Sequence, residues 1–155
     1  MTEQNVTQKF VNEAVAILEL LDGHLEKVKR ENSFGSLLTL RKMNKLTNQL
    51  AGASFVIEFH HIAQIAELFE EITHLVVGKT DPEIVNEGIR CFERSSETLK
   101  YYVESLKADK VEINTGLVRD LTSYIDKLGG ARKRLTQAEI DKLMKRRIKS
   151  GQQNG

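Results

Sequence analysis

The strongest constraint on the fold of this chain is the spacing of its apolar residues. They recur at every third or fourth position through most of the first 128 residues, which is the period of an amphipathic helix. In the first segment this spacing gives one continuous apolar stripe, formed by Phe10, Ala14, Ile17, Leu18, Leu21, Leu25 and Val28. A single proline interrupts the 155 residues. The pattern therefore predicts an all-α protein.

Turn and capping residues divide this pattern into five segments. Helices are expected over residues 6–30, 37–57, 61–77, 82–107 and 114–128. Ser36 is placed to cap the second helix, and Asp81 followed by Pro82 is a typical start for the fourth. We expect residues 1–130 to form an up-down four-helix bundle with one additional C-terminal helix. Gly129 and Gly130 then end the fifth helix and lead into a tail, residues 131–155.

Composition narrows the class of protein further. Apolar residues make up 40% of the chain and charged residues 29%, as in ordinary globular proteins. There is no run of about 18 apolar residues and no signal peptide, so we expect a cytoplasmic protein without a membrane span. One cysteine, Cys91, excludes a disulfide framework. No set of His, Cys and carboxylate residues has metal-ligand spacing, so neither a metal nor a cofactor is expected.

The charges are distributed unevenly. Residues 131–155 carry eight Lys or Arg against Glu139 and Asp141, a net charge of +6. The preceding 130 residues carry 15 basic and 20 acidic side chains, a net charge of −5. An acidic body with a basic tail indicates two regions with different tasks.

The second helix has one apolar seam and one distinctive polar side. The seam is predicted to comprise Leu40, Met43, Leu46, Leu50 and Ala53. The opposite side is expected to be exposed and to consist of Arg41, Asn44, Lys45, Asn48, Gly52 and Phe55. A glycine inside a helix lowers helix stability by about 1 kcal/mol relative to alanine, so a specific role is expected for Gly52. Either another helix approaches closely there, or bare backbone gives a partner access to Asn48. The aromatic Phe55 on the same side favours a docking surface.

These residues resemble a known family. Asn48-Gln49-Leu50-Ala51-Gly52, followed after a turn by the helix of residues 62–70, resembles the histidine-phosphotransfer (HPt) signature. That signature is a helix bearing His-x-x-Lys-Gly and then a helix rich in Leu and Ala. The first segment is similar to the opening helix of the phosphotransfer domain of chemotaxis histidine kinases, and the similarity spans roughly residues 6–106. The resemblance implies a bundle that presents its functional side chain on the second helix.

The chain departs from that family at the reactive positions. The phosphoacceptor histidine falls on Asn48 and the assisting lysine on Ala51, while Gly52 matches. We expect both substituted positions to be exposed or at the edge of the seam. Because an amide nitrogen is a poor nucleophile, Asn48 does not replace the imidazole as a phosphoryl carrier. His24, His60, His61 and His74 lack the motif and are expected to be partly exposed structural residues. The resemblance thus implies a pseudo-HPt domain that is not an enzyme.

The tail contains a short segment with strong helix-start signals. Thr136 and Glu139 form a capping box, and Leu135 and Ile140 are placed for a hydrophobic staple. The expected helix carries Ile140, Leu143 and Met144 on one face. Such a face either packs back on the bundle or binds the groove of a partner.

The same segment resembles the peptide by which flagellar motor-switch proteins bind the phosphorylated chemotaxis response regulator. The family pattern is Leu-Ser-Gln-x-Glu-Ile-Asp-x-Leu-Leu. The residues that match or nearly match are Leu135, Thr136, Gln137, Glu139, Ile140, Asp141, Leu143 and Met144. In the switch proteins the motif lies at the N-terminus, whereas here it lies near the C-terminal end of the sequence. Both resemblances imply the same class of partner, the receiver domain of a response regulator.

Three functions are therefore open. The favoured one is a non-catalytic adaptor that binds a chemotaxis-type receiver domain, alone or within a flagellar switch or chemotaxis complex. The alternative is a response-regulator phosphatase that orients water with Asn48, helped by Gln49 or Asn44. Such phosphatases usually have an acidic residue one turn away, but here positions 44 and 45 are Asn and Lys. Binding of nucleic acid or of an anionic membrane by the basic tail is least favoured, because aromatic residues are not interleaved with the charges.

Overall fold

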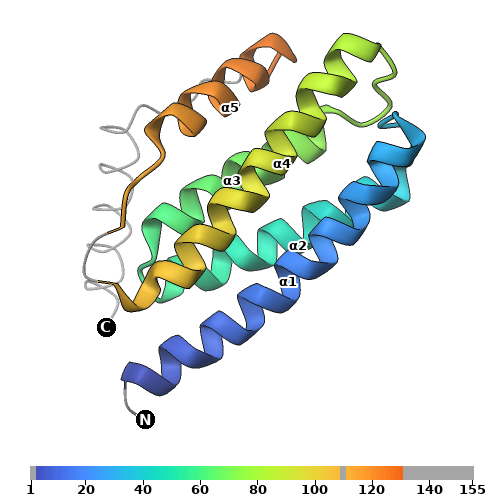
Figure 1. Ribbon diagram of the computed structural model, residues 1–155. Helices are drawn as coiled ribbons and strands as arrows, with labels where there is room; N and C mark the ends of the chain where they lie inside the picture. The colour runs from blue at the N-terminus through green and yellow to red at the C-terminus, as the bar shows by residue number, and fades with distance from the viewer. Residues whose placement is uncertain (1–2, 109–110, 131–155) are drawn as a thin grey trace, which may run out of the picture.

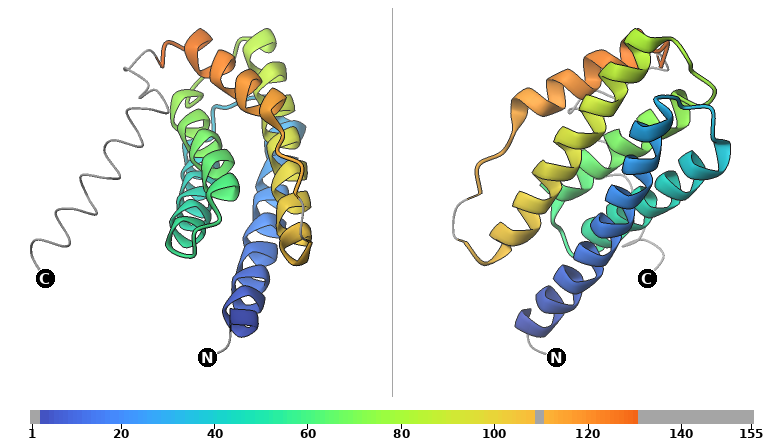
Figure 2. Two further views of the ribbon diagram at one scale, coloured as in Figure 1. Left: turned by 90° about the vertical axis from the view of Figure 1, so that its left-hand side faces the viewer. Right: turned by 45° about the vertical axis from the view of Figure 1, so that its right-hand side comes forward.

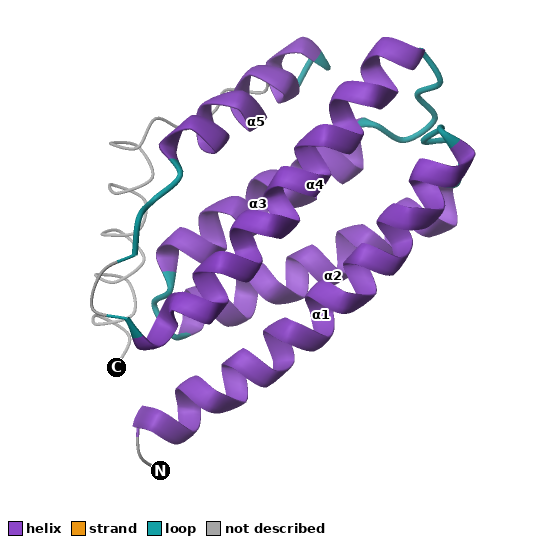
Figure 3. Cartoon of the chain, in the orientation of Figure 1, coloured by secondary structure: helices purple, strands orange, loops and turns teal. Residues whose placement is uncertain are grey.

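The computed structural model describes residues 3–108 and 111–130 (Figure 1). Within these ranges the chain forms five α-helices and one 3-10 turn, and contains no strand (Figure 3). The elements are α1 (Glu3–Glu31), α2 (Leu37–Val56), α3 (His60–Leu75), α4 (Pro82–Glu104), η1 (Ser105–Lys107) and α5 (Thr115–Lys127). The all-α prediction is confirmed, and each helix ends within a turn of its expected position. The predicted tail peptide lies outside the described residues.

The helices pack as a bundle in which consecutive helices run in opposite directions (Figures 1 and 2). α1 packs against α2 and α4, and α3 packs against the same two helices, so α1 and α3 lie diagonally across the bundle. α5 lies against α3 and α4. No helix in the described part of the chain is long and apolar enough to cross a membrane.

Side-chain caps fix where the helices begin. Ser36 Oγ accepts a hydrogen bond from the Thr39 amide, and Asp81 Oδ1 accepts one of 2.9 Å from the Glu83 amide, as the sequence predicts. Asn114 Oδ1 caps α5 by accepting from the Leu117 amide at 3.0 Å. These caps satisfy amides that have no partner inside their own helix.

The core confirms the helical period. All seven apolar residues of the α1 stripe are buried. Phe69 stacks on Phe92 with ring centroids 4.7 Å apart, and Phe34 meets the edge of Phe92. Phe34 belongs to the turn after α1, yet it is fully buried, and its backbone exchanges hydrogen bonds with the turn after α3. The turn is therefore part of the core.

The buried side of α2 is broader than the predicted seam. Leu40, Met43 and Leu50 are buried, and Leu46 and Ala53 are half-buried. Thr47, Ala51 and Ser54 are buried as well. The two hydroxyls are tolerated there because each donates to a backbone carbonyl within its own helix, Thr47 to Met43 and Ser54 to Leu50. The expectation that Ala51 would be exposed or at the seam's edge is wrong, since it is only 6% exposed.

One glycine is required by packing. A Cβ on Gly88 of α4 would lie 2.6 Å from Tyr124 Oη and 2.7 Å from Phe34 Cζ.

We therefore expect Gly88→Ala to lower the free energy of unfolding by roughly 1–3 kcal/mol, because these rings must shift. The matched control is Gly23→Ala on α1, where nothing lies within 4 Å of the added carbon. It should stabilise the protein by about 0.5–1 kcal/mol. Urea denaturation measures both changes, and equal effects would contradict the packing role of Gly88.

Candidate functional site

The six residues predicted to form a docking face all lie on α2, but they are not equivalent. Five are exposed: Arg41, Lys45, Asn48, Gly52 and Phe55. Asn44 is half-buried, and its Nδ2 donates to Glu70 O at 3.2 Å and to Thr73 Oγ1 at 3.0 Å on α3. Asn44 thus joins the two helices, and these two hydrogen bonds use both hydrogens of its side-chain NH2 group.

Asn48 lies one turn further along α2, beside the same helix. Its Nδ2 donates a hydrogen bond of 2.9 Å to Glu70 Oε1 on α3. An ionised carboxylate is an acceptor only, so this bond orients the carboxamide with its NH2 group toward α3. The carbonyl Oδ1 is then the end of the amide that can accept a hydrogen bond from an incoming group.

A shallow cavity of about 280 Å³ lies between α2 and α3. It is lined by Asn48, Ala51, Gly52, Phe55, Glu67 and Glu70. Nothing lies within 4 Å of a Cβ built on Gly52, so close helix packing is not the reason for this glycine. Of the two explanations open from the sequence, only bare backbone at the surface is left.

Helix α3 supplies the acidic groups of this cavity. Burial and the neighbouring charge of Glu70 together raise the pKa of Glu67 above its ordinary value. By contrast α2 has no acidic residue, and its exposed Arg41 and Lys45 lie on the N-terminal side of the cavity. Sequence analysis missed the two glutamates because they lie on another helix. The only signal for them was their place within the HPt-like segment of residues 62–70.

The cavity lies in a groove between α2 and α3, and the end of this groove nearest the α2–α3 turn is apolar. Phe55 is 43% exposed and meets the edge of the His60 ring, with centroids 6.1 Å apart. Val56, the last residue of α2, is 78% exposed. The groove between α2 and α3 therefore changes from acidic beside Asn48 to apolar at Phe55.

None of the four histidines lines the cavity beside Asn48. His24 and His61 are half-buried, and burial is the main cause that lowers the pKa of each ring. His61 packs edge-on against Tyr102 with ring centroids 4.9 Å apart. His60 and His74 are exposed. Among the residues that the structure describes, no group of three or more His, Cys, Asp or Glu side chains is arranged to hold a metal ion.

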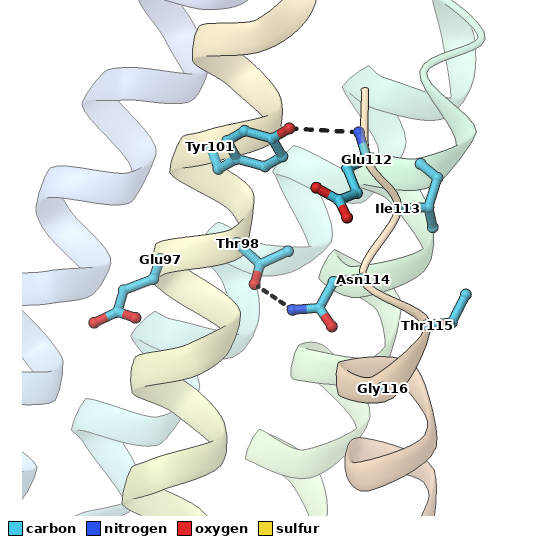
Figure 4. Close-up of a pocket in the computed structure, with 8 residues that line it drawn as sticks. All are labelled: Glu97, Thr98, Tyr101, Glu112, Ile113, Asn114, Thr115 and Gly116. Atoms are coloured by element: carbon cyan, nitrogen blue, oxygen red, sulfur yellow. Dashed lines mark hydrogen bonds between the residues drawn. The ribbon is translucent and has the colours of Figure 1, made fainter. Parts of the chain in front are cut away.

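A larger cavity of about 400 Å³ lies where the loop after α4 meets α5 (Figure 4). Its polar groups bond to one another: the Glu112 amide donates to Tyr101 Oη at 3.4 Å, and Asn114 Nδ2 donates to Thr98 Oγ1 at 3.4 Å. Behind it, the Asn114 amide donates to Tyr102 Oη at 2.7 Å. These contacts hold the start of α5 against α4. Sequence analysis did not predict this cavity, and we assign it a structural role.

Comparisons with models of protein families, with curated proteins and with solved structures gave no significant match for this chain. The functions that the HPt and motor-switch resemblances imply are therefore proposals. The observations that bear on them are the placement of Asn48, the open backbone at Gly52 and the charges of the α2–α3 groove.

The raised pKa of Glu67 gives a prediction with a defined sign. Because the native state binds this proton more tightly than the unfolded state, the ionised carboxylate destabilises the native state at neutral pH. We expect Glu67→Gln to raise the melting temperature at pH 7. The gain should shrink as the pH falls through the raised pKa and vanish well below the ordinary value of 4.5. Thermal melts from pH 3 to pH 8 measure this. Glu13→Gln, an exposed position on α1, is the control, and a gain at pH 7 that persists at pH 3 would refute the electrostatic explanation.

Proposed function

We propose that this protein is a non-catalytic HPt-like adaptor for receiver domains of chemotaxis-type response regulators. The observation that carries the proposal is the placement of Asn48. It is exposed on the second helix, one turn before an unobstructed glycine and beside a shallow cavity. This is the position at which the family that the chain resembles presents its phosphoacceptor. An asparagine there keeps the docking geometry and loses the nucleophile.

The charge of α2 supports a receiver as the partner. Arg41 and Lys45 are exposed, and no acidic residue on the same helix offsets them. A phosphorylated receiver presents an anionic aspartyl phosphate, which basic side chains attract during encounter. The tail segment that resembles the motor-switch peptide would bind the same class of partner. Two weak sites on one chain raise the apparent affinity through effective concentration. The partner class in turn implies a cytoplasmic location.

One observation favours the phosphatase alternative. The acidic residue that the sequence lacks one turn from Asn48 is present in space, because Glu70 accepts from Asn48 Nδ2 at 2.9 Å. A carboxamide fixed in this way can orient an attacking water through Oδ1. Against it, Glu67 and Glu70 both line the cavity, and their charges would repel an entering phosphoryl group. We therefore prefer the adaptor.

The two functions separate in one experiment. The full-length protein is titrated with a chemotaxis receiver domain, phosphorylated and unphosphorylated, while binding and the decay of the aspartyl phosphate are both followed. The adaptor predicts tighter binding of the phosphorylated form, an unchanged decay rate and no phosphohistidine on this chain. Faster decay that is lost in Asn48→Ala would establish the phosphatase instead. An absence of binding would eliminate both.

A pair of glycine variants tests the docking face. Gly52→Arg should weaken receiver binding at least about tenfold, the equivalent of 1.4 kcal/mol, because a long side chain blocks close approach to the backbone. Gly23→Arg on α1 is the matched control, since both glycines are exposed within helices with nothing within 4 Å. It should leave binding unchanged. Circular dichroism checks that both variants fold. Unchanged affinity of Gly52→Arg would show that the α2 face is not the docking surface.

A further inference from the structure

We propose that the α1–α2 end of the bundle binds the surface of an anionic phospholipid bilayer. The residues concerned, called here the turn-end surface, are Lys27, Leu37, Leu38, Arg41, Lys42 and Lys45, and all six are exposed. They lie on the last turns of α1 and the first half of α2, at the end of the bundle away from the N-terminus (Figure 1). This inference goes beyond the proposed function and does not depend on it. Three features point to a bilayer: the concentration of positive charge, the lack of acidic partners for it, and two exposed leucines beside it.

Positive charge in the body of the protein is concentrated at this end. Residues 25–45 carry six basic and two acidic side chains, a net charge of +4. Residues 1–130 carry 15 basic and 20 acidic side chains in all, so the rest of this range has 9 basic and 18 acidic, a net charge of −9. A negatively charged surface attracts the one region and repels the other. The charge distribution therefore orients the approach of the molecule to such a surface.

The basic side chains of the turn-end surface are not neutralised by acidic neighbours. Among the residues that the structure describes, no carboxylate oxygen lies within 4 Å of the charged nitrogens of Lys27, Arg41, Lys42 or Lys45. By contrast Lys29, on another side of α1, pairs with Glu26 at 3.5 Å and with Glu93 at 3.7 Å. α2 has no acidic residue, and Glu31 at the end of α1 offsets one of the four positive charges. These charges are therefore available to a partner.

The basic residues of the two helices form one cluster. His24 of α1 is half-buried, and the pKa of its ring is lowered by burial and then by the charges of Lys42 and Lys27. Lys42 belongs to α2 and Lys27 to α1, so both ammonium groups lie near the same ring. An anionic surface at this place would therefore contact both helices together.

The apolar part of the turn-end surface is the first turn of α2. Leu37 is 44% exposed and Leu38 is 64% exposed. The core beneath this turn is already filled by Phe34, which is fully buried. The Phe34 amide donates to Lys79 O at 3.2 Å, and Phe34 O accepts from the Gly78 amide at 2.9 Å. Because these contacts fix the turn, the two leucines stay at the surface of the molecule.

This combination of side chains favours a bilayer over a nucleic acid, although both are polyanions. Aliphatic side chains enter the boundary between headgroups and acyl chains while neighbouring Lys and Arg contact the lipid phosphates. A nucleic acid would use the charges, but its bases stack on aromatic side chains, and the turn-end surface has none. A bilayer therefore accounts for Leu37 and Leu38 as well as for the basic cluster.

Tryptophan fluorescence tests whether this surface meets the bilayer. The chain has no tryptophan, so Leu38→Trp in the full-length protein reports on this site alone. We expect its emission to shift to shorter wavelength, and brominated acyl chains to quench it, on vesicles of phosphatidylcholine and phosphatidylglycerol in equal parts. Vesicles of phosphatidylcholine alone should have neither effect. The control is Val15→Trp, which replaces an apolar residue 41% exposed where α1 borders α4. Its emission should not change on either kind of vesicle.

Paired charge reversals separate the turn-end surface from attraction by net charge, to which the basic tail also contributes. Lys27→Glu with Lys42→Glu should lower partitioning onto the anionic vesicles at least about tenfold, because each basic residue at the membrane surface strengthens binding several-fold. The matched control is Lys9→Glu with Arg90→Glu, two exposed residues outside this surface. It changes the net charge equally and should lower partitioning less than about threefold. Vesicle sedimentation measures both, and circular dichroism checks that the variants fold.

Three results would overturn the proposal. One is an absence of binding to the anionic vesicles, which would leave the adaptor untouched because its docking face is tested with a receiver. Another is an equal loss of binding in the two charge-reversal pairs, or binding without a spectral change in Leu38→Trp, since either would place the contact elsewhere. The last is duplex DNA that displaces the vesicles while Leu38→Ser leaves vesicle binding unchanged, which would assign the basic cluster to nucleic acid instead.

Discussion

The close contact between α2 and α3 is the constraint on which the rest of the site depends. On α2 this contact uses residues that are small or hydroxylated, Thr47, Ala51 and Ser54, and α3 contributes buried Ala63 and Ala66. Small side chains let two helix backbones approach each other, and the hydroxyls remain satisfied within their own helix. The Phe59 amide donates to Ser54 O at 2.8 Å, which closes the turn between the helices. The two helices thus pack as one helical hairpin.

This pairing also sets the chemistry of the groove. Asn44 binds the α3 backbone at Glu70 and the hydroxyl of Thr73, and that contact fixes the register of the two helices. One turn later the same register places Asn48 beside the Glu70 carboxylate and leaves Gly52 open. A basic helix therefore borders an acidic cavity. In the proposed adaptor, this is the face that a receiver domain would contact.

The helices and the core were predictable because both follow from local rules. The 3.6-residue period identified the α1 stripe, and Ser36, Asp81 and Pro82 marked where helices start. The buried side of α2 was predicted less well. A search for apolar residues at helical spacing does not identify Thr47 and Ser54 as buried. Their burial depends on hydrogen bonds that their hydroxyls donate to carbonyls one turn earlier. Ala51 was misplaced for a similar reason, because alanine is compatible with either side of a helix.

The sequence by itself determined the helical class, the positions of the turns, the separation of an acidic body from a basic tail, and the exposure of Asn48 and Gly52. All of these depend on residues close together along the chain. Only the tertiary structure decided that Glu67 and Glu70 complete the cavity, that Gly88 rather than Gly52 is the glycine required by packing, and that Gly130 packs beside Leu75. Each of these joins residues on different helices, and the register between helices is set by how side chains fit together, which helical periodicity does not encode.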